Sequence, residues 1–294
     1  EQALRDVLRL SRGMTYKAAI TGLPLGGGKT VVIGDPKKIK TPELFRSLGR
    51  AVDTLGGRYI IAEDAGTVVE DMVHVHTQTK HVAGISHDGD GNGDPSPTTV
   101  LGIFIGIKAS VRHRIGKQDL RGLKISVQGL GKVGYGICKL LAAEGVKLYV
   151  TDIQGDTVNQ AVKEFGATAV SANEIYSQDV DVFVPCAMGA ILNDTSIKSL
   201  KAKIVAGAAN NQLAERRHGD MLRDLKILYA PDYVINAGGL ISAYYEYAAH
   251  SAGKMYNHAD TLAHTRKIDG TLESIFKQAE AEGISTNTAA DRIA

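Results

Sequence analysis

A glycine-rich segment between two strand patterns constrains the fold of this chain more than any other feature. The pattern of a buried strand over 124–128 runs directly into the sequence GLGKVG, which starts at Gly129 and opens an apolar helix. A second strand pattern, over 146–151, ends on Asp152. A lone G-x-G-x-x-G sequence is a weak signal. Strand, glycines, helix, strand and an acid about 20 residues further on are together typical of a dinucleotide-binding βαβ unit.

The residue types in this segment suit a nicotinamide dinucleotide. Gly129 allows a tight turn, Gly131 lets the backbone approach a pyrophosphate, and Gly134 lets the helix pack closely on the strand. Free amides at the helix N-terminus favour the phosphates. Asp152 can accept hydrogen bonds from ribose hydroxyls and would repel a 2′-phosphate, which predicts NAD rather than NADP. The alternative, a glycine turn that binds nothing, is disfavoured by this full context. The predicted cofactor residues here are Gly129, Gly131, Lys132, Val133, Gly134 and Asp152.

Strand and helix patterns alternate along almost the whole chain, which predicts an α/β fold with largely parallel sheets. The length of 294 residues suggests two domains. A polar connection over 115–122 precedes the strand at 124–128, so we place the boundary there. We expect an α/β substrate-binding domain over 1–118 and a Rossmann domain over 119–271, with a cleft between them. A C-terminal helix over 272–294 is expected to pack back on the first domain.

The composition excludes several classes of partner. The 34 basic and 32 acidic residues give a net charge of +2, which offers no electrostatic reason to expect nucleic acid or an anionic membrane. No apolar run approaches the ~18 residues of a membrane-spanning helix, and no signal peptide opens the chain. Cys138 and Cys186 lie far apart without metal-ligand spacing, which fits a reducing cytoplasm. The chain starts at Glu1 inside a helical pattern, so we expect a further piece of the N-terminal domain before it.

A second glycine cluster, over 22–30, contains Lys29, a candidate catalytic residue. It differs from a phosphate-binding loop because Leu23 stands where that motif needs glycine, and the strand pattern at 31–33 follows it instead of a helix. A strand pattern over 59–62 delivers Asp64 at its end. Lys29 among glycines near this acid suggests a desolvated amine, whose pKa burial can lower by up to ~3–5 units. Lys29 is therefore a candidate general base, the alternative being a solvated surface lysine.

Two patterns only imitate metal sites. Residues 88–93 resemble the first half of an EF-hand loop, but its twelfth position is Thr99 rather than a bidentate glutamate. His74 and His76 would point about 200° apart on a helix, so they are expected at the surface rather than on one metal. The sequence therefore predicts no metal site.

Six segments resemble the leucine, valine and phenylalanine dehydrogenase branch of the amino-acid dehydrogenase superfamily, and leucine dehydrogenases most of all. They are GMTYK at 13–17, LGGGK at 25–29, AED at 62–64, DPSP at 94–97, GAANNQ at 207–212 and PDYVINAGG at 231–239. The motifs are long, ordered and spread over essentially the whole chain, which makes the resemblance specific. Asp94 stands where many relatives have Asn, the tail at 242–266 diverges, and the N-terminal part of the family's substrate domain is missing. These departures weaken the substrate assignment more than the reaction.

The resemblance implies a role for each matching residue of the first domain. Lys17 binds the substrate carboxylate, helped by the amides of Gly26 and Gly27. Lys29 is the general base that activates the attacking water, and Asp64 exchanges protons with the amino group. The implied reaction is hydride transfer from the α-carbon to NAD, addition of water to the iminium ion, and departure of ammonia from the carbinolamine.

The resemblance also implies where the nicotinamide and the substrate side chain lie. Thr99 and Asn211 are expected beside the nicotinamide, Asn211 contacting the substrate as well. Ala62, Leu240 and Ala243 are expected to line the side-chain pocket. All three are apolar, so the carboxylate of a glutamate substrate would be buried there without a partner.

The function predicted on this basis is the reversible, NAD-dependent oxidative deamination of a branched-chain L-amino acid by a cytoplasmic homo-oligomer. Ala62 is typical of leucine dehydrogenases and Leu240 of phenylalanine dehydrogenases, so an aromatic amino-acid dehydrogenase is the alternative within the family. A non-catalytic NAD-binding regulator is the alternative from another class. The presence of Lys17, Lys29 and Asp64 argues against that regulator, because a protein without turnover does not need them.

Overall fold

The computed structural model describes residues 1–64, 66–85 and 93–294, which form two compact units. Unit 1 comprises Glu1–Pro95 and Gly239–Leu262, and unit 2 comprises Ser96–Gly238 and Ala263–Ala294. This division differs from the predicted one, because residues 96–118 and the C-terminal helices belong to unit 2. The EF-hand-like segment at 88–93 lies almost entirely outside the described residues.

Unit 1 is built from helices around a small apolar core. Its helices are α1 (Gln2–Ile20), α2 (Pro36–Ile39), α3 (Pro42–Asp53), α4 (Val69–His76), most of α11 (Gly238–Ser251) and most of α12 (His258–Thr265). Helix α3 has a well-formed start, since the Thr41 side chain accepts a hydrogen bond from the Leu44 amide and Pro42 occupies the first turn. The core gathers Phe45, Val52, Ile61, Met72, Val75, Val82 and Ile85.

The two strands predicted in this part of the chain do not form. Residues 25–33 have no regular secondary structure, and Ile33 is exposed. The segment at 59–62 makes a single parallel bridge between Ile61 and Val82, with Ala62 exposed beyond it. β-branched residues favour a strand only where a neighbouring strand pairs with them, and the described part of unit 1 offers none to residues 31–33.

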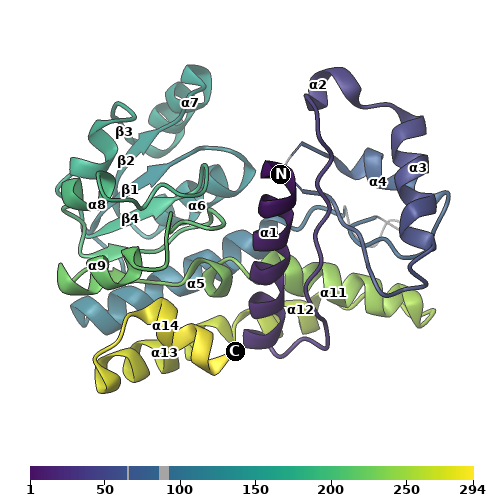
Figure 1. Cartoon of the computed structure of the whole chain (residues 1–294). Helices are drawn as coiled ribbons and strands as arrows, with labels where there is room; N and C mark the ends of the chain where they lie inside the picture. The colour runs from purple at the N-terminus through teal and green to yellow at the C-terminus, as the bar shows by residue number, and fades with distance from the viewer. Residues whose placement is uncertain (65, 86–92) are drawn as a thin grey trace. The chain divides into compact units, whose positions relative to one another are not determined.

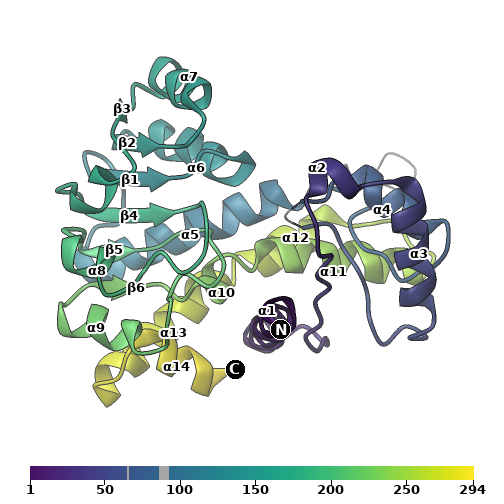
Figure 2. The same cartoon turned by 45° about the horizontal axis from the view of Figure 1, so that its top comes forward.

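Unit 2 contains the predicted Rossmann domain (Figures 1 and 2). In the described chain a six-stranded parallel sheet has the order β3-β2-β1-β4-β5-β6. The strands are β1 (Lys124–Gln128), β2 (Lys147–Thr151), β3 (Thr168–Ala169), β4 (Val182–Pro185), β5 (Ile204–Val205) and β6 (Leu228–Tyr229). The strand predicted at 124–128 is confirmed, and the one predicted at 146–151 begins one residue later.

Helices cover both faces of this sheet. Helices α5, α6 and α7 lie side by side on one face, and η1, α8 and α9 on the other, while α13 packs along α5. Their bounds are α5 (Ser96–Ile115), α6 (Lys132–Ala143), α7 (Gly155–Phe165), η1 (Glu174–Ser177), α8 (Ser196–Ser199), α9 (His218–Asp224), α10 (Asp232–Ile235), α13 (Ile268–Glu282) and α14 (Thr286–Ile293). The single helix predicted over 272–294 is two helices, α13 and α14. Of these, α13 packs along α5, and all three helices belong to unit 2.

The strand order fixes where a ligand of this sheet binds. From β1 the chain continues to β2 on one side of the sheet's middle, and from the adjacent β4 it continues to β5 on the other side. Open parallel sheets bind their ligands at such a switch point, beyond the carboxyl ends of the strands. The glycine segment that begins at Gly129 directly follows β1.

Candidate active site

In unit 1 the structure brings the predicted base and the predicted proton carrier into direct contact. The Lys29 ammonium donates a hydrogen bond to Oδ2 of Asp64. The lysine side chain is 22% exposed and the carboxylate 48%, so the pair is reachable from solvent on the carboxylate side. A covered amine that touches a more open carboxylate is suited to passing protons between a reacting group and water.

Asp64 is held by a turn that the sequence analysis missed. Its backbone amide donates to Oγ1 of Thr67 at 2.8 Å, and the Thr67 hydroxyl and amide donate to the Asp64 carbonyl at 2.8 and 2.9 Å. The threonine three residues after Asp64 was the available signal, because threonine hydroxyls commonly close such turns. The backbone that carries Asp64 is therefore fixed locally.

The glycine loop lies against the helix that carries Lys17. A Cβ atom on Gly27 would come within 2.2 Å of Thr15 Oγ1 and 2.3 Å of the Ser11 carbonyl oxygen, so only glycine fits against α1 there. A Cβ on Gly26 would meet no heavy atom within 4 Å, which leaves the loop backbone open on that side. Lys17 is half-buried two residues after Thr15 on the same helix.

The three predicted side-chain pocket residues all belong to unit 1. Leu240 and Ala243 are half-buried and three residues apart on α11, so they share a helix face. Ala62 follows the bridge residue Ile61, whose amide donates to the His81 carbonyl at 3.0 Å. A hydrogen bond of 3.2 Å between His81 Nδ1 and the Tyr247 hydroxyl ties this segment to α11.

One carboxyl group on α11 was overlooked in the sequence. Glu246 is half-buried three residues after Ala243, on the same side of the helix. Burial raises the pKa of Glu246 from 4.5 to about 7. Glu246 therefore adds a titratable group to the face of α11 that carries Leu240 and Ala243.

In unit 2 the glycine turn has the geometry that a dinucleotide requires. Gly129 has φ +94°, its amide donates to the Thr151 carbonyl at 2.8 Å, and a Cβ there would lie 2.8 Å from the Ala187 amide. A Cβ on Gly134 would lie 2.0 Å from the Gly129 oxygen, so the helix packs closely on the turn. A Cβ on Gly131, the N-cap of α6, would meet no heavy atom within 4 Å. The turn thus leaves open backbone at a helix N-terminus, as pyrophosphate binding needs, with Lys132 and Val133 as its first helical residues.

Asp152 is fixed to that turn. Its Oδ2 accepts from the Leu130 amide at 2.5 Å, and its Oδ1 accepts from the Gln154 amide at 2.8 Å. Each carboxylate oxygen has a further lone pair, which remains suitable for a ribose hydroxyl. The acid after β2 is therefore held beside the glycine segment, where the sequence predicted it.

Two large apolar side chains at the carboxyl ends of the strands were also missed. Ile153, directly after Asp152, is 98% exposed, and Met188, three residues after the end of β4, is exposed as well. Water-exposed apolar groups beside a ligand site commonly contact the flat rings of the ligand. The position of Ile153 immediately after the predicted ribose-binding acid was the available signal.

The loop that carries Asn211 follows β5 and is anchored by its neighbour. The Gln212 side chain donates to the carbonyls of Gly207 and Ala209 at 2.9 and 3.0 Å, and its amide donates to Asp232 Oδ2 at 2.8 Å. Asn211 adopts φ +50°, a left-handed conformation that asparagine tolerates better than most residues. The loop is thus held at the carboxyl edge of the sheet with Asn211 half-buried.

Thr99 lies in the first turn of α5 and is half-buried. The segment at 236–238 packs beside it, because a Cβ on Gly238 would come within 2.2 Å of the Thr98 oxygen. The Asn236 side-chain amide donates to the Ala208 carbonyl at 2.9 Å and to Asn210 Oδ1 at 2.8 Å. Through these contacts unit 2 holds the start of α5 next to the loop of Asn211.

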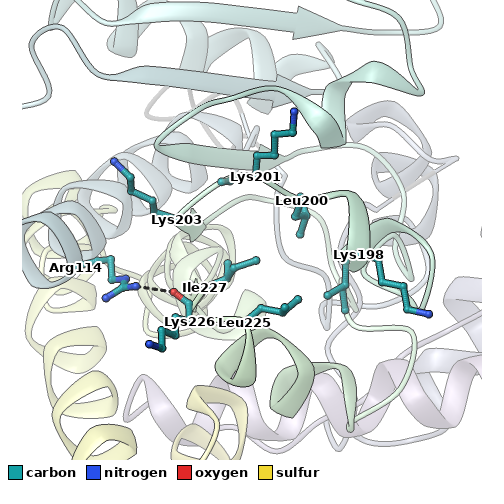
Figure 3. A pocket seen from close by; sticks show the side chains of 10 residues that line it. Arg114, Lys198, Leu200, Lys201, Lys203, Leu225, Lys226 and Ile227 are labelled. Carbon is teal, nitrogen blue, oxygen red and sulfur yellow. Dashed lines mark hydrogen bonds between the residues drawn. The ribbon is translucent and has the colours of Figure 1, made fainter.

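A hollow at the opposite, amino-terminal edge of the sheet is unrelated to this site (Figure 3). It measures about 280 Å³ and is lined by Arg114, Ile197, Lys198, Leu200, Lys201, Ala202, Lys203, Leu225, Lys226 and Ile227. Figure 3 shows the ammonium groups of Lys198, Lys201 and Lys203 pointing away from its middle, so they do not converge on an anion.

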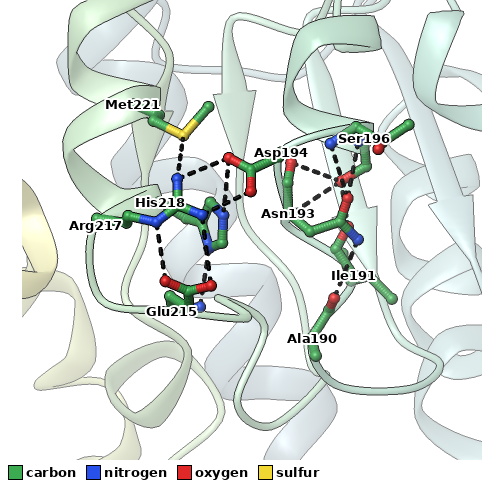
Figure 4. A network of polar contacts seen from close by, with 10 residues as sticks. Ala190, Ile191, Asn193, Asp194, Ser196, Glu215, Arg217, His218 and Met221 are labelled. Carbon is green, nitrogen blue, oxygen red and sulfur yellow. Dashed lines mark hydrogen bonds and ion pairs between the residues drawn. The ribbon is translucent and has the colours of Figure 1, made fainter.

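A second polar cluster in unit 2 is structural (Figure 4). The Arg217 guanidinium donates to Asp194 Oδ1 and Oδ2 at 2.7 and 2.6 Å and to Glu215 Oε2 at 2.9 Å. These contacts hold the pKa of the Asp194 carboxyl down, at about 2. Nδ1 of the buried His218 accepts from the Glu215 amide at 2.9 Å. The network joins the loops before α8 and α9.

The two cysteines, and the pair formed by His76 and His250, make packing contacts. Cys138 is buried in α6, and burial raises the pKa of both thiols, that of Cys186 to about 12. His76 packs edge-on against His250, with ring centroids 6.1 Å apart. In the part of the chain that the structure describes, no three metal-ligating side chains come together. None of the described helices combines the length and the apolar composition of a membrane-spanning segment.

Comparison with known proteins adds to this geometry. Residues 1–81 match the family model "Glu/Leu/Phe/Val dehydrogenase, dimerisation domain", and residues 150–294 match "Glutamate/Leucine/Phenylalanine/Valine dehydrogenase". The chain is 50% identical over 294 residues to a leucine dehydrogenase of Bacillus subtilis, covering 100% of this chain and 79% of that protein. It is 43% identical over 300 residues to a phenylalanine dehydrogenase of Bacillus thermotolerans, covering 100% of this chain and 76% of that protein.

A solved structure supports the same comparison. The crystal structure of L-tryptophan dehydrogenase from Nostoc punctiforme superposes with a TM-score of 0.83 at 45% sequence identity. The superposition covers 99% of this chain and 82% of the other.

Proposed function

Because the chain belongs to the Glu/Leu/Phe/Val dehydrogenase family, we propose that it oxidatively deaminates leucine, isoleucine or valine with NAD. It is an amino-acid dehydrogenase that uses a nicotinamide dinucleotide. The single observation that carries the proposal is the contact between Lys29 and Asp64. A lysine and a carboxylate in contact supply the two proton carriers that deamination requires.

The proton steps can be assigned to this pair. When bound, the nicotinamide ring accepts the hydride of the substrate α-carbon, so the substrate nitrogen must first be neutral. Asp64 takes the proton of the substrate ammonium. Lys29 releases its ammonium proton to water through Asp64 before the substrate binds. As a neutral amine it then takes a proton from the water that adds to the resulting iminium carbon. Asp64 returns its proton to the leaving nitrogen and then accepts the hydroxyl proton as the carbonyl forms and ammonia departs. The exposed side of Asp64 lets the released protons pass to water.

Substrate orientation rests on the surroundings of this pair. Lys17 on α1 binds the substrate carboxylate together with the backbone of Gly26, which is open, and of Gly27, which packs against α1, because a cation and backbone amides match its charge and its acceptor oxygens. This leaves the α-carbon to be directed by groups at the nicotinamide, for which we propose Thr99 and Asn211.

The side-chain preference rests on Ala62, Leu240 and Ala243. An aliphatic side chain fits three apolar residues without leaving a polar group unpaired. The leucine dehydrogenase likeness at 50% identity favours branched-chain substrates over the aromatic ones of the phenylalanine relative at 43%. An aromatic preference is the second candidate, favoured by the small Ala243 on the same face of α11 as Leu240.

The choice of NAD over NADP rests on Asp152. Its carboxylate is fixed after β2 by the Leu130 and Gln154 amides, where a 2′-phosphate would meet its charge. A homo-oligomer is proposed from the dimerisation-domain match over 1–81. The two free thiols, Cys138 and Cys186, support a cytoplasmic location.

The test is the reduction of NAD measured by absorbance with a panel of L-amino acids. We expect kcat/KM to be highest for leucine, isoleucine or valine, lower for phenylalanine and tryptophan, and not measurable for glutamate. A protein that binds NAD but reduces it with no amino acid is the non-catalytic regulator, and the proposal is then wrong.

A further inference from the structure

The loop that carries Lys29 has little support of its own. Residues 25–33 form no helix or strand, and within the described chain no backbone–backbone hydrogen bond involves residues 26–34. Side-chain contacts and close packing must therefore set the position of Lys29. One such contact, of Gly27 with α1, lies on the N-terminal side of Lys29.

Tyr59 supplies the other contacts. A hydrogen bond of 3.0 Å joins its hydroxyl to the hydroxyl of Thr30, directly after Lys29. Its ring lies against Gly28, directly before Lys29, since a Cβ on that glycine would be 2.6 Å from Cδ2 and 2.7 Å from Cε2 of the ring. Tyr59 thus touches the loop on both sides of Lys29.

Tyr59 is itself anchored in the body of unit 1. It is half-buried and packs against the apolar core that contains Phe45 and Ile61. Ile61 is fixed to the neighbouring segment by its amide bond to the His81 carbonyl at 3.0 Å, while its own carbonyl accepts from the Ala83 amide at 2.8 Å. A ring held by a packed core can hold a loop that lacks backbone hydrogen bonds.

The same short segment carries the partner of Lys29. Asp64 lies five residues after Tyr59, with the bridged Ile61 between them. Tyr59, which contacts the loop, and Asp64, which binds Lys29, are therefore parts of one short segment that is fixed at Ile61. Because Asp64 is also held by its turn with Thr67, we expect a change at the Tyr59 hydroxyl to displace Lys29 more than Asp64.

We propose that Tyr59 is a positioning residue for catalysis, which holds the glycine loop so that Lys29 stays against Asp64. The inference rests on the proposed role of Lys29 as general base. The position of the loop is set mainly by the hydrogen bond between the Tyr59 and Thr30 hydroxyls. The Tyr59 ring, packed against Gly28, limits movement of the loop toward it. Small displacements of a catalytic group reduce the rate of the chemical step far more than they reduce substrate binding.

The first test removes one hydroxyl. Tyr59→Phe keeps the ring and the core contact, and we expect kcat for leucine to fall about tenfold while KM for leucine and NAD changes less than about twofold. Thr30→Val should give a similar loss, and the double variant should be no worse than either single variant, because both remove the same bond. Thr30→Ser keeps the hydroxyl and should restore most of kcat. Tyr256→Phe, which removes a hydroxyl beside His258 in the same unit, is the matched control and should leave kcat unchanged.

A second test asks whether Tyr59 acts through Lys29. In a Lys29→Ala background, Tyr59→Phe should not lower the residual kcat any further. In the otherwise unchanged protein, Gly28→Ala should lower kcat, because the added Cβ would meet the Tyr59 ring. An unchanged kcat in folded Tyr59→Phe would overturn the proposal. An equal loss in both backgrounds would also overturn it, since Tyr59 would then act independently of Lys29. Full activity of Lys29→Ala alone would instead contradict the proposed function and not the bracing contact.

Discussion

The carboxylate of Asp152 and the backbone amide of Leu130 are joined by a hydrogen bond of 2.5 Å. The acid that ends the second strand of the Rossmann unit thus holds the turn between Gly129 and Gly131. We propose that this one side chain serves both the shape of the glycine turn and the choice of cofactor.

This contact gives the first prediction. Asp152→Ser should weaken the binding of NAD, because the ribose loses its hydrogen-bond acceptor and the glycine turn loses a contact. The substitution should also remove the repulsion between the carboxylate and the 2′-phosphate of NADP. The ratio of kcat/KM for NAD over NADP should therefore fall at least tenfold. Asp119→Ser is the control, since the Asp119 carboxylate likewise accepts a hydrogen bond from a backbone amide, that of Arg121, but in the loop before β1. Equal use of both cofactors by the unchanged protein would show that Asp152 does not govern the choice.

Lys17 should affect substrate binding first. Lys17→Ala removes the proposed partner of the substrate carboxylate, so KM for leucine should rise at least tenfold, with KM for NAD nearly unchanged. Steady-state kinetics with each substrate varied in turn measure both constants. A rise in KM for NAD alone would place Lys17 at the cofactor instead.

Ala62 should set the upper size of the substrate side chain. Ala62→Gly enlarges the pocket at the segment held by the bridge between Ile61 and Val82, where the backbone cannot readily shift. The ratio of kcat/KM for phenylalanine over leucine should rise about tenfold, or ~1–2 kcal/mol. An unchanged protein that already prefers phenylalanine or tryptophan would assign the selection to Leu240 and Ala243.

Glu246 should make the stability of the protein depend on pH near neutrality. Burial raises its pKa from 4.5 to about 7, so between these values the folded protein binds more protons than the unfolded chain. Stability contributed by the neutral acid is present at low pH and is lost as the pH rises through this window. Glu246→Gln should therefore raise Tm at about pH 8 and change it little at about pH 4.5. Glu70→Gln on α4, an exposed site, is the control, and an equal Tm change at both pH values would contradict the assignment.

The Rossmann unit could be predicted because its signals are local. Strand, turn, helix, strand and acid follow one another within residues 124–152, and Gly129, Gly131 and Gly134 each suit the turn or the packing of its helix. The supports of Lys29 could not be predicted in this way. Tyr59 lies 31 residues after Gly28 and 29 after Thr30 in sequence, and their contact leaves no periodic pattern in either segment.

The strand predicted at 31–33, which does not form, and the difference between the predicted and observed domain boundary have related causes. The β-branched run at 31–33 has strand propensity, but a strand also needs a pairing partner that the sequence does not reveal. The residues of α5 precede the polar connection at 115–122, so the sequence alone assigns them to the first domain. Its packing along α6 and α13, which places it in unit 2, depends on residues far along the chain.

The contact between Lys29 and Asp64 is tested most directly by kcat of purified Lys29→Ala with leucine and NAD, measured beside its affinity for NAD. Loss of the base that activates water should lower kcat by several orders of magnitude, while Kd for NAD, whose glycine turn lies in unit 2, should stay nearly the same. Retention of more than about a tenth of the original kcat would contradict the general-base role and with it the proposed chemistry.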